Sequence, residues 1–290
     1  MTQLLGHSGP VNVVKFNNNA GRYCLSGGRD RSIRLWNPHT ASQVKAYNGH
    51  GYEVLGLSIT PDNTHFASCG GDKSVFVWDV QAGATVRRCV GHDSKVNTVA
   101  FNGDASVLLS GSFDSTVRIW DMRARQRLPL QILDDASDSV VDVCVSGSIV
   151  YSASVDGFVR TYDLRAGQLR QDYLDHAVTS VKPTSDNSAI LVSTLDNKVR
   201  LLDTATGELL ATFSGHAAEK FKAVSTFGLG DSSVISTSED GRLLVWDMLE
   251  SRIVSQHKSH EKAVLYVDHH PTREEMVSSG SDGVINFYSR

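Results

Sequence analysis

Short apolar runs of four to seven residues recur along the whole chain, each bounded by Gly, Asp, Asn or Ser. The first set covers residues 11–16, 23–26 and 32–36, and a fourth run at 43–47 follows. Runs of this length and composition are typical of β-strands. No segment keeps a 3.6-residue apolar period for the roughly ten residues that a helix needs. The pattern therefore predicts an all-β chain.

The runs belong to a unit that repeats about every 42 residues. The third run of each unit ends at an aromatic residue or leucine, namely Trp36, Trp78, Trp120, Tyr162, Leu202, Trp246 and Tyr288. Six positions before each of these stands an aspartate, which is Asp30, Asp72, Asp114, Asp156, Asp196, Asp240 or Asp282. Seven units fill residues 1–290 and leave no room for a linker, so we expect a single domain.

Gly-His before the first strand and Trp-Asp after the third mark most units, as in Gly49-His50 and Trp78-Asp79. A unit of this length with both marks is typical of one four-stranded propeller blade. On these marks the chain resembles the WD40 family over its whole length, which implies a closed seven-bladed β-propeller. The last unit stops after its third strand, so we expect residues 2–5 to supply the fourth and close the ring. That strand is short, which leaves room for further residues before Met1.

Four units carry His, Ser, Asp and Trp at equivalent positions. The sets are His7, Ser26, Asp30, Trp36; His50, Ser68, Asp72, Trp78; His92, Ser110, Asp114, Trp120; and His216, Ser236, Asp240, Trp246. Ser, His and Asp together suggest a hydrolase. Four copies and the lack of a G-x-S-x-G elbow argue against an active site, so we expect no enzyme and no catalytic residue. The WD40 resemblance implies a structural relay instead, from indole to hydroxyl to imidazole to carboxylate.

Units four and five are degenerate. Unit four has Asp135 in place of the histidine and Tyr162 in place of tryptophan, and unit five has Val192 and Leu202 at the hydroxyl and tryptophan positions. Because each lost buried hydrogen bond is worth about 1 kcal/mol, we expect these two blades to open first. Unit seven is nearly complete, with His260, Ser278, Asp282 and Tyr288.

Charge and hydropathy narrow the choice of partners. The 28 basic and 32 acidic side chains give a net charge of -4, which argues against direct nucleic-acid binding. No apolar stretch approaches the roughly 18 residues of a membrane helix, and the start of the chain lacks a secretion signal. We therefore expect a soluble intracellular chain. Its expected location is the cytoplasm and nucleus, where we expect it to be monomeric within larger complexes.

The cysteines and histidines predict no metal or cofactor site. Cys24, Cys69, Cys89 and Cys144 form no C-x-x-C pair and have apolar flanks, which favours small buried hydrophobes. The adjacent residues 269 and 270 are both histidine, but neighbours on a strand point to opposite faces. We expect neither to ligate a metal.

The Gly-His loops and the aspartate turns are expected on one face, the usual docking face of the family. Beside these marks stand Arg29, Tyr52, Glu53, Lys95, Phe113, Asp138, Lys222, Glu239 and Lys262. A mixture of both charges with aromatic side chains suits a protein or peptide partner. These nine residues are the predicted partner-binding set.

Segments outside the general blade consensus resemble one branch of the family, the mitogen-activated protein kinase organisers. They include Leu35-Trp-Asn-Pro38, Gly70-Gly-Asp-Lys73, Ser154-Val-Asp-Gly157 and Thr206-Gly-Glu-Leu-Leu210. This resemblance implies a non-catalytic scaffold associated with MAP-kinase modules and with the late spliceosome. The partners it implies are spliceosomal proteins or MAP-kinase module components.

Two short motifs suggest a different role. Trp120-Asp-Met-Arg123 and Tyr162-Asp-Leu-Arg165 place an arginine two residues after the aspartate. They resemble the box through which some WD40 proteins dock on the adaptor of a cullin ubiquitin ligase. Such boxes overlap the ordinary blade consensus, so a substrate receptor of a cullin-RING ligase stands as the alternative function.

Overall fold

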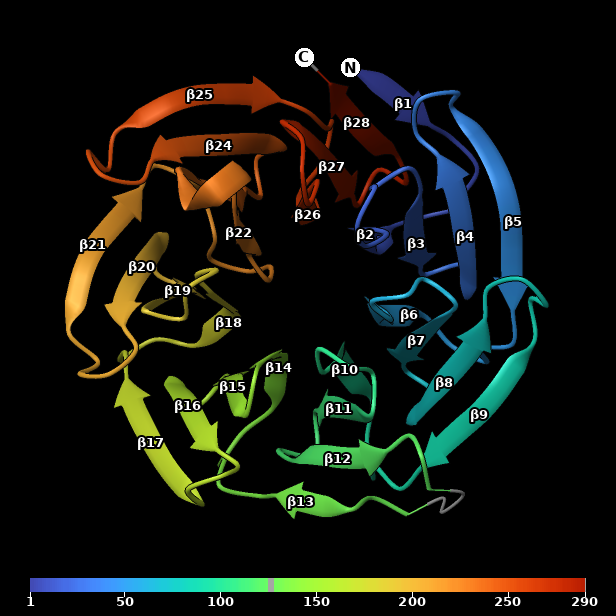
Figure 1. Ribbon diagram of the computed structural model, residues 1–290. Helices are drawn as coiled ribbons and strands as arrows, with labels where there is room; N and C mark the ends of the chain where they lie inside the picture. Colours follow the sequence, from blue (N-terminus) through green and yellow to red (C-terminus); the bar gives the residue numbers. More distant parts are fainter. Residues whose placement is uncertain (125–127, 290) are drawn as a thin grey trace.

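Seven four-stranded antiparallel sheets stand around a common centre (Figure 1). The computed structural model describes residues 1–124 and 128–289, and within these residues it contains 28 strands and one short 3-10 turn. The predicted all-β, seven-bladed propeller is confirmed. No helix long and apolar enough to cross a membrane occurs among the described residues.

The strands follow the order of the repeats. Blade one holds β2 (Val11–Phe16), β3 (Cys24–Gly28), β4 (Ser32–Asn37) and β5 (Ser42–Asn48); blade two holds β6 (Val54–Ile59), β7 (His65–Gly70), β8 (Ser74–Asp79) and β9 (Thr85–Val90). Blade three holds β10 (Val96–Phe101), β11 (Val107–Ser112), β12 (Val117–Asp121) and β13 (Gln131–Leu133); blade four holds β14 (Val140–Ser146), β15 (Ile149–Ser154), β16 (Phe158–Asp163) and β17 (Gln168–Tyr173). Blade five holds β18 (Val178–Pro183), β19 (Ala189–Thr194), β20 (Lys198–Asp203) and β21 (Leu209–Ser214). Blade six holds β22 (Ser225–Phe227), the turn Leu229–Asp231, β23 (Ser233–Thr237), β24 (Arg242–Asp247) and β25 (Ile253–Lys258); blade seven holds β26 (Val264–His269), β27 (Glu275–Gly280), β28 (Ile285–Ser289) and β1 (Thr2–Leu4).

The ring closes through the first strand of the chain. β1 pairs antiparallel with β28, with Leu4 opposite Ile285, so the two ends of the chain lie together in blade seven (Figure 1). Leu4 is 1% exposed and packs in one core cluster with Trp36 and Ile285. The predicted N-terminal contribution to the last blade is confirmed.

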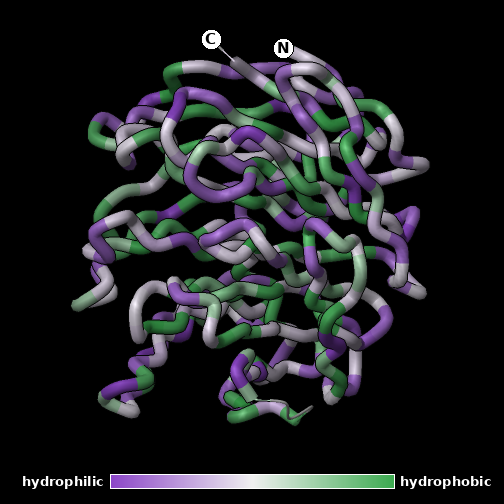
Figure 2. The backbone as a smooth tube through the Cα atoms, turned by 45° about the vertical axis from the view of Figure 1, so that its right-hand side comes forward, coloured by the Kyte–Doolittle hydropathy of each residue, from purple (hydrophilic) through white to green (hydrophobic). Residues whose placement is uncertain are grey.

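The hydrophobic core lies between neighbouring blades. One cluster joins Val13 and Ile33 of blade one to Val54, Phe66 and Trp78 of blade two. Figure 2 shows hydrophobic and hydrophilic residues interspersed along the chain in every part of the ring. Each blade is therefore held by both of its neighbours.

The antiparallel order places two kinds of loop at the same end of every blade. In blade one, Val11 at the start of β2 pairs with Gly28 at the end of β3, so the loop before β2 and the turn between β3 and β4 adjoin. We call the surface formed by these loops the relay face, and the other end of the blades the opposite face. The Gly-His residues and the turn aspartates belong to the relay face.

The innermost strands line a central channel of about 360 Å³. Residues from all seven of these strands contribute, and the charged ones are Lys15, Asp142, Lys182 and Asp268. Two of them join blades: Asp142 Oδ2 accepts the main-chain N–H of Val181 at 3.1 Å, and Asp268 Oδ2 accepts that of Phe16 at 2.9 Å. These channel carboxylates are thus part of the ring's own structure.

Candidate functional site on the relay face

A hydrogen-bond relay crosses blade two from its third strand to the loop before its first. The indole Nε1 of Trp78 donates to Ser68 Oγ at 2.8 Å, this oxygen lies 2.7 Å from His50 Nε2, and His50 Nδ1 lies 2.7 Å from Asp72 Oδ2. Because the indole can only donate, the hydroxyl donates to Nε2 and the Nδ1–H donates to the carboxylate. Burial alone would raise the pKa of Asp72, but hydrogen bonds from His50 and main-chain groups lower it.

Blades one and three contain the same relay. Trp36 and Trp120 donate to their serine hydroxyls at 2.8 and 2.9 Å, and His7 and His92 reach their aspartates at 2.9 and 2.8 Å. Blade seven builds a variant in which His260 lies 2.8 Å from Ser278 and the Tyr288 hydroxyl replaces the indole at 3.2 Å. The relay therefore ties the entry loop to the aspartate turn in four blades.

The relay serines are not placed for catalysis. Ser26, Ser68 and Ser110 are each 0% exposed, and every one already bonds an indole and an imidazole. A nucleophile must meet its substrate, and these hydroxyls cannot. The propeller fold is in general a non-catalytic interaction scaffold, and nothing in the described part of the chain shows an enzymatic site.

The prediction of a relay in blade six is wrong. No relay joins the four residues expected to form it, which are His216, Ser236, Asp240 and Trp246. Trp246 Nε1 donates to the main-chain oxygen of Ser214 at 3.1 Å, Ser236 Oγ accepts from the Ser225 hydroxyl at 3.0 Å, and Asp240 pairs with Arg242 at 2.6 Å. Both ring nitrogens of His216 are buried without a partner, and this burial lowers the histidine pKa to about 4.

The loop that follows His216 explains the difference. Gly215 adopts a φ of +112°, whereas Gly6, Gly49 and Gly91 of blades one to three keep negative φ. Glu239 Oε1 then accepts the main-chain N–H groups of Glu219, Lys220 and Phe221 at 2.7, 2.5 and 2.7 Å. The loop folds onto this carboxylate and leaves the imidazole out of reach of its serine and aspartate.

Blades four and five replace the missing histidine contact with arginine, which the sequence reasoning missed. Arg160 and Arg200 stand four residues after the turn aspartates and pair with Asp156 and Asp196 at 2.8 and 2.5 Å. The Arg160 and Asp156 side chains are 3% and 5% exposed, so this ion pair is buried. The Asp-x-x-x-Arg spacing was the signal that could have revealed it. His176 stands 3.8 Å from Asp196 and is half exposed.

Most of the predicted partner-binding residues are exposed to solvent, and two of them form hydrogen bonds within the chain. Exposed on the relay face are Arg29, Tyr52, Lys95, Phe113, Asp138 and Lys262, and Glu53 is half-buried beside them. Tyr52 and Phe113 are 63% and 53% exposed, and Lys95 Nζ lies 5.0 Å from the Phe113 ring centre. An exposed aromatic beside a cation is a common feature of interface anchors.

Two members of the predicted set serve the chain itself. Lys222 Nζ, on blade six, donates to the main-chain oxygen of Val141 on blade four at 2.8 Å. Glu239 holds the loop described above, and its three main-chain donors lower its pKa in spite of burial. These contacts make both side chains structural, so they leave the set of open docking groups.

Charge is unevenly distributed over the relay face. Blades one to three expose the cations Arg29, Arg31, Lys73 and Lys95, whereas the loops of blades four and five expose Asp134, Asp135, Asp138 and Asp175. Asp93 on blade three and Lys198 on blade five are exposed charges of the opposite sign, so the difference between the two sides is one of balance. The two groups lie on different sides of the ring in Figure 1. A partner that covers this face meets a basic side and an acidic side, which fixes its orientation.

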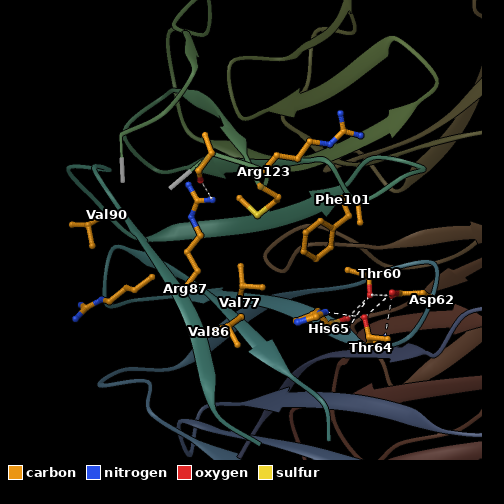
Figure 3. A pocket seen from close by; sticks show the side chains of 14 residues that line it. Thr60, Asp62, Thr64, His65, Val77, Val86, Arg87, Val90, Phe101 and Arg123 are labelled. Atoms are coloured by element: carbon orange, nitrogen blue, oxygen red, sulfur yellow. Dashed lines mark hydrogen bonds between the residues drawn. The ribbon is translucent and has the colours of Figure 1, made fainter. Parts of the chain in front are cut away.

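The opposite face carries a cavity of about 920 Å³ between blades two and three (Figure 3). Val77, Val86 and Phe101 give it apolar walls, and Arg123 stands at its edge. Arg123 pairs with Asp104 at 3.1 Å, and both side chains are exposed. The arginine of the first adaptor-like motif therefore borders an apolar hollow.

The cysteines and histidines behave as structural residues. Cys24, Cys69 and Cys89 are buried, Cys144 is partly buried, and all four are free. Burial raises the pKa of the Cys89 thiol, which disfavours the reactive thiolate. Among the described residues there is no group of three or more potential metal ligands.

Comparison with known proteins agrees with the geometry. The family model described as "WD domain, G-beta repeat" matches residues 1–37, 41–79, 83–121, 207–247 and 251–289. The human and zebrafish (Danio rerio) proteins named WD repeat domain-containing protein 83 are 48% and 50% identical, covering 91% and 93% of this chain and 84% and 86% of theirs. An uncharacterised WD repeat-containing protein of Schizosaccharomyces pombe is 43% identical over 96% of this chain and 94% of its own length. The chain belongs to the WD40-repeat family.

Proposed function

We propose that this WD40 protein is a non-catalytic scaffold for proteins of pre-mRNA splicing complexes, of MAP-kinase modules, or of both. The observation that carries the proposal is the relay face, where exposed Tyr52 and Phe113 stand among charges of both signs. Buried relays of hydrogen bonds hold the loops that present these side chains, so the surface is prepared for binding without chemistry. The segments that resemble the MAP-kinase organiser branch support the choice of partners.

The proposed partners are proteins, and the proposed location is the cytoplasm and nucleus. The net charge of -4 and the aspartates of blades four and five oppose direct binding of a phosphate backbone. A protein of an RNA-processing complex can act through other proteins and leave the RNA to them.

Affinity purification of the endogenously tagged protein, followed by mass spectrometry, tests this function. We expect spliceosomal proteins, MAP-kinase module proteins or both with the wild type. A variant with Tyr52→Ala, Lys95→Glu and Lys262→Glu should lose them and keep its melting temperature, because all three side chains are exposed. Recovery of neither protein class with the wild type would refute the proposal.

A ubiquitin-ligase substrate receptor is the second candidate. Arg123 and Arg165 are both exposed on the opposite face, and the first borders the apolar cavity of Figure 3. Arg123→Ala with Arg165→Ala should abolish adaptor pull-down if this function holds. Absence of adaptor from the wild-type purification would exclude it.

A further inference from the structure

Blade two presents a hollow of about 480 Å³ on the relay-face side. Tyr52 from the loop before β6, Lys73 from the turn between β7 and β8, and Arg88 from the outermost strand β9 all line it. Tyr52 packs closely on Gly71, where an added Cβ would lie 2.9 Å from the tyrosine Cβ. Three parts of the blade thus bring two cations and an exposed aromatic ring to one concave surface, which the turn aspartate Asp72 also lines.

Arg88 is held in place without an acidic partner. Its Nε and Nη2 donate to Ser74 Oγ at 3.2 and 3.0 Å, and its guanidinium carbon lies 5.1 Å from the ring centre of the buried Phe76. In the described part of the chain Arg88 makes no ion pair and its Nη1 has no hydrogen-bond partner, and Lys73 also lacks an ion pair. A fixed guanidinium with a free edge is suited to bind a carboxylate.

The other blades show that this arrangement is unusual. Arg34, Arg160 and Arg200 stand on third strands and pair with the turn aspartates of their own blades at 3.6, 2.8 and 2.5 Å. Blade two has Phe76 at that position, and its arginine comes from the neighbouring strand, opposite Phe76 in the register. Arg88 therefore forms no ion pair with Asp72, the turn aspartate that lines the same hollow. Arg118 of blade three differs again, because it pairs with the exposed Asp93 at 4.0 Å.

Ser74, which accepts from Arg88, does not donate to the carboxylate of the turn aspartate of its blade. In blades one and three the equivalent hydroxyls of Ser32 and Thr116 donate to the turn aspartates at 2.8 and 2.6 Å. Ser74 donates instead to the main-chain oxygen of Asp72 at 3.1 Å, and Asp72 Oδ1 is left buried without a partner. An unpaired buried acceptor destabilises the folded chain, and departures of this kind are expected at functional sites.

We propose that this hollow binds an aspartate or glutamate side chain from an extended segment of a partner protein. The carboxylate lies against Lys73 and the free edge of Arg88, and the neighbouring apolar part of the segment covers the Tyr52 ring. The inference rests on the proposed function only in treating the relay face as a protein-docking surface. The cations that surround the hollow on blades one to three strengthen the attraction, and Glu53 pairs with neither Lys73 nor Arg88 in the described structure.

Fluorescence anisotropy on the full chain tests the proposal. The probe is a fluorescein-labelled peptide of four glutamates flanked by leucines, and the matched probe carries glutamines in their place. We expect the glutamine probe to bind at least tenfold more weakly, and added salt to weaken only the glutamate probe. Arg88→Gln with Lys73→Gln should weaken the glutamate probe at least tenfold and leave the melting temperature within about two degrees, because both side chains are exposed.

A second double variant, Arg22→Gln with Arg252→Gln, removes the same charge from exposed sites at the other end of the blades and should bind like the wild type. Equal affinity for the two probes, or full affinity in the Arg88 and Lys73 variant, would overturn the proposal. Tighter binding of an oligouridylate that depends on the same two residues would also overturn it in favour of a nucleic-acid site. The peptide result does not depend on which cellular proteins are purified, so the two proposals fail separately.

Discussion

Removal of one buried serine hydroxyl should lower the free energy of unfolding much more in blade two than in blade six. Ser68 and Ser236 are both 0% exposed, and each stands ten residues before a tryptophan. In Ser68→Ala, the Trp78 indole N–H and His50 Nε2 both lose their bond, and both groups are buried. A buried polar group left without a partner costs about 1–3 kcal/mol, so we expect a loss of about 2–5 kcal/mol.

The substitution Ser236→Ala should remove few stabilising hydrogen bonds. The Trp246 indole bonds the main-chain oxygen of Ser214, and the Ser225 hydroxyl that donates to Ser236 also contacts Ser193 at 2.5 Å. We therefore expect a loss of about 1 kcal/mol. The two substitutions remove the same atom at equally buried positions, so each is the matched control of the other.

Urea unfolding followed by circular dichroism measures both losses. At roughly 2–4 °C per kcal/mol for a chain of this size, thermal melting should show the same order. Trp78→Phe combined with Ser68→Ala should cost less than the sum of the single substitutions, because the two residues share one bond. Equal midpoints for Ser68→Ala and Ser236→Ala would refute the idea that blade six has lost its relay.

Three further predictions follow from the same structure. Leu4→Ala should cost about 2–5 kcal/mol in urea unfolding, whereas Leu5→Ala, at a position 66% exposed, should cost almost nothing; equal costs would contradict closure by β1. His216 has a folded-state pKa of about 4, below the usual 6.5, so its contribution is complete above about pH 6.5 and is lost as the pH falls towards 4. His216→Gln should therefore reduce the loss of unfolding free energy between pH 7 and 4.5, to which this group contributes about 2 kcal/mol in the wild type; an unchanged dependence on pH would contradict it. Among the innermost strands, the three-residue β22 of blade six should show the fastest amide exchange. Faster exchange in blades four and five would instead support the sequence-based expectation that those two blades open first.

Repeat spacing was sufficient to predict the ring, because six of the seven blades are each made from consecutive strands of the chain. The first apolar run, 11–16, is strand β2 to the residue, and the expected strand at 2–5 is β1 with one residue fewer. The relays of blades one to three could also be read from the sequence, since His, Ser, Asp and Trp recur at nearly fixed intervals.

In blade six the spacing of residues failed to predict the side-chain contacts. Its histidine precedes its serine by 20 residues, against 18 in blades two and three, and the extra residues belong to the loop that Glu239 folds. Blade six thus keeps the histidine, serine, aspartate and tryptophan of the relay, but the backbone of the loop no longer brings their side chains together. Lys222 was beyond sequence reasoning for another reason, because its acceptor is 81 residues away on another blade.

The pairing of Leu4 with Ile285 gives the molecule an order of assembly. β1 has no partner until β28 has been synthesised, so it must wait while the strands between them are made. The pairing of β1 with β28 joins the strands that are farthest apart in the sequence, and it closes the ring. A partner present during synthesis would find blades one to three, with the Arg88 hollow, already formed before the ring exists.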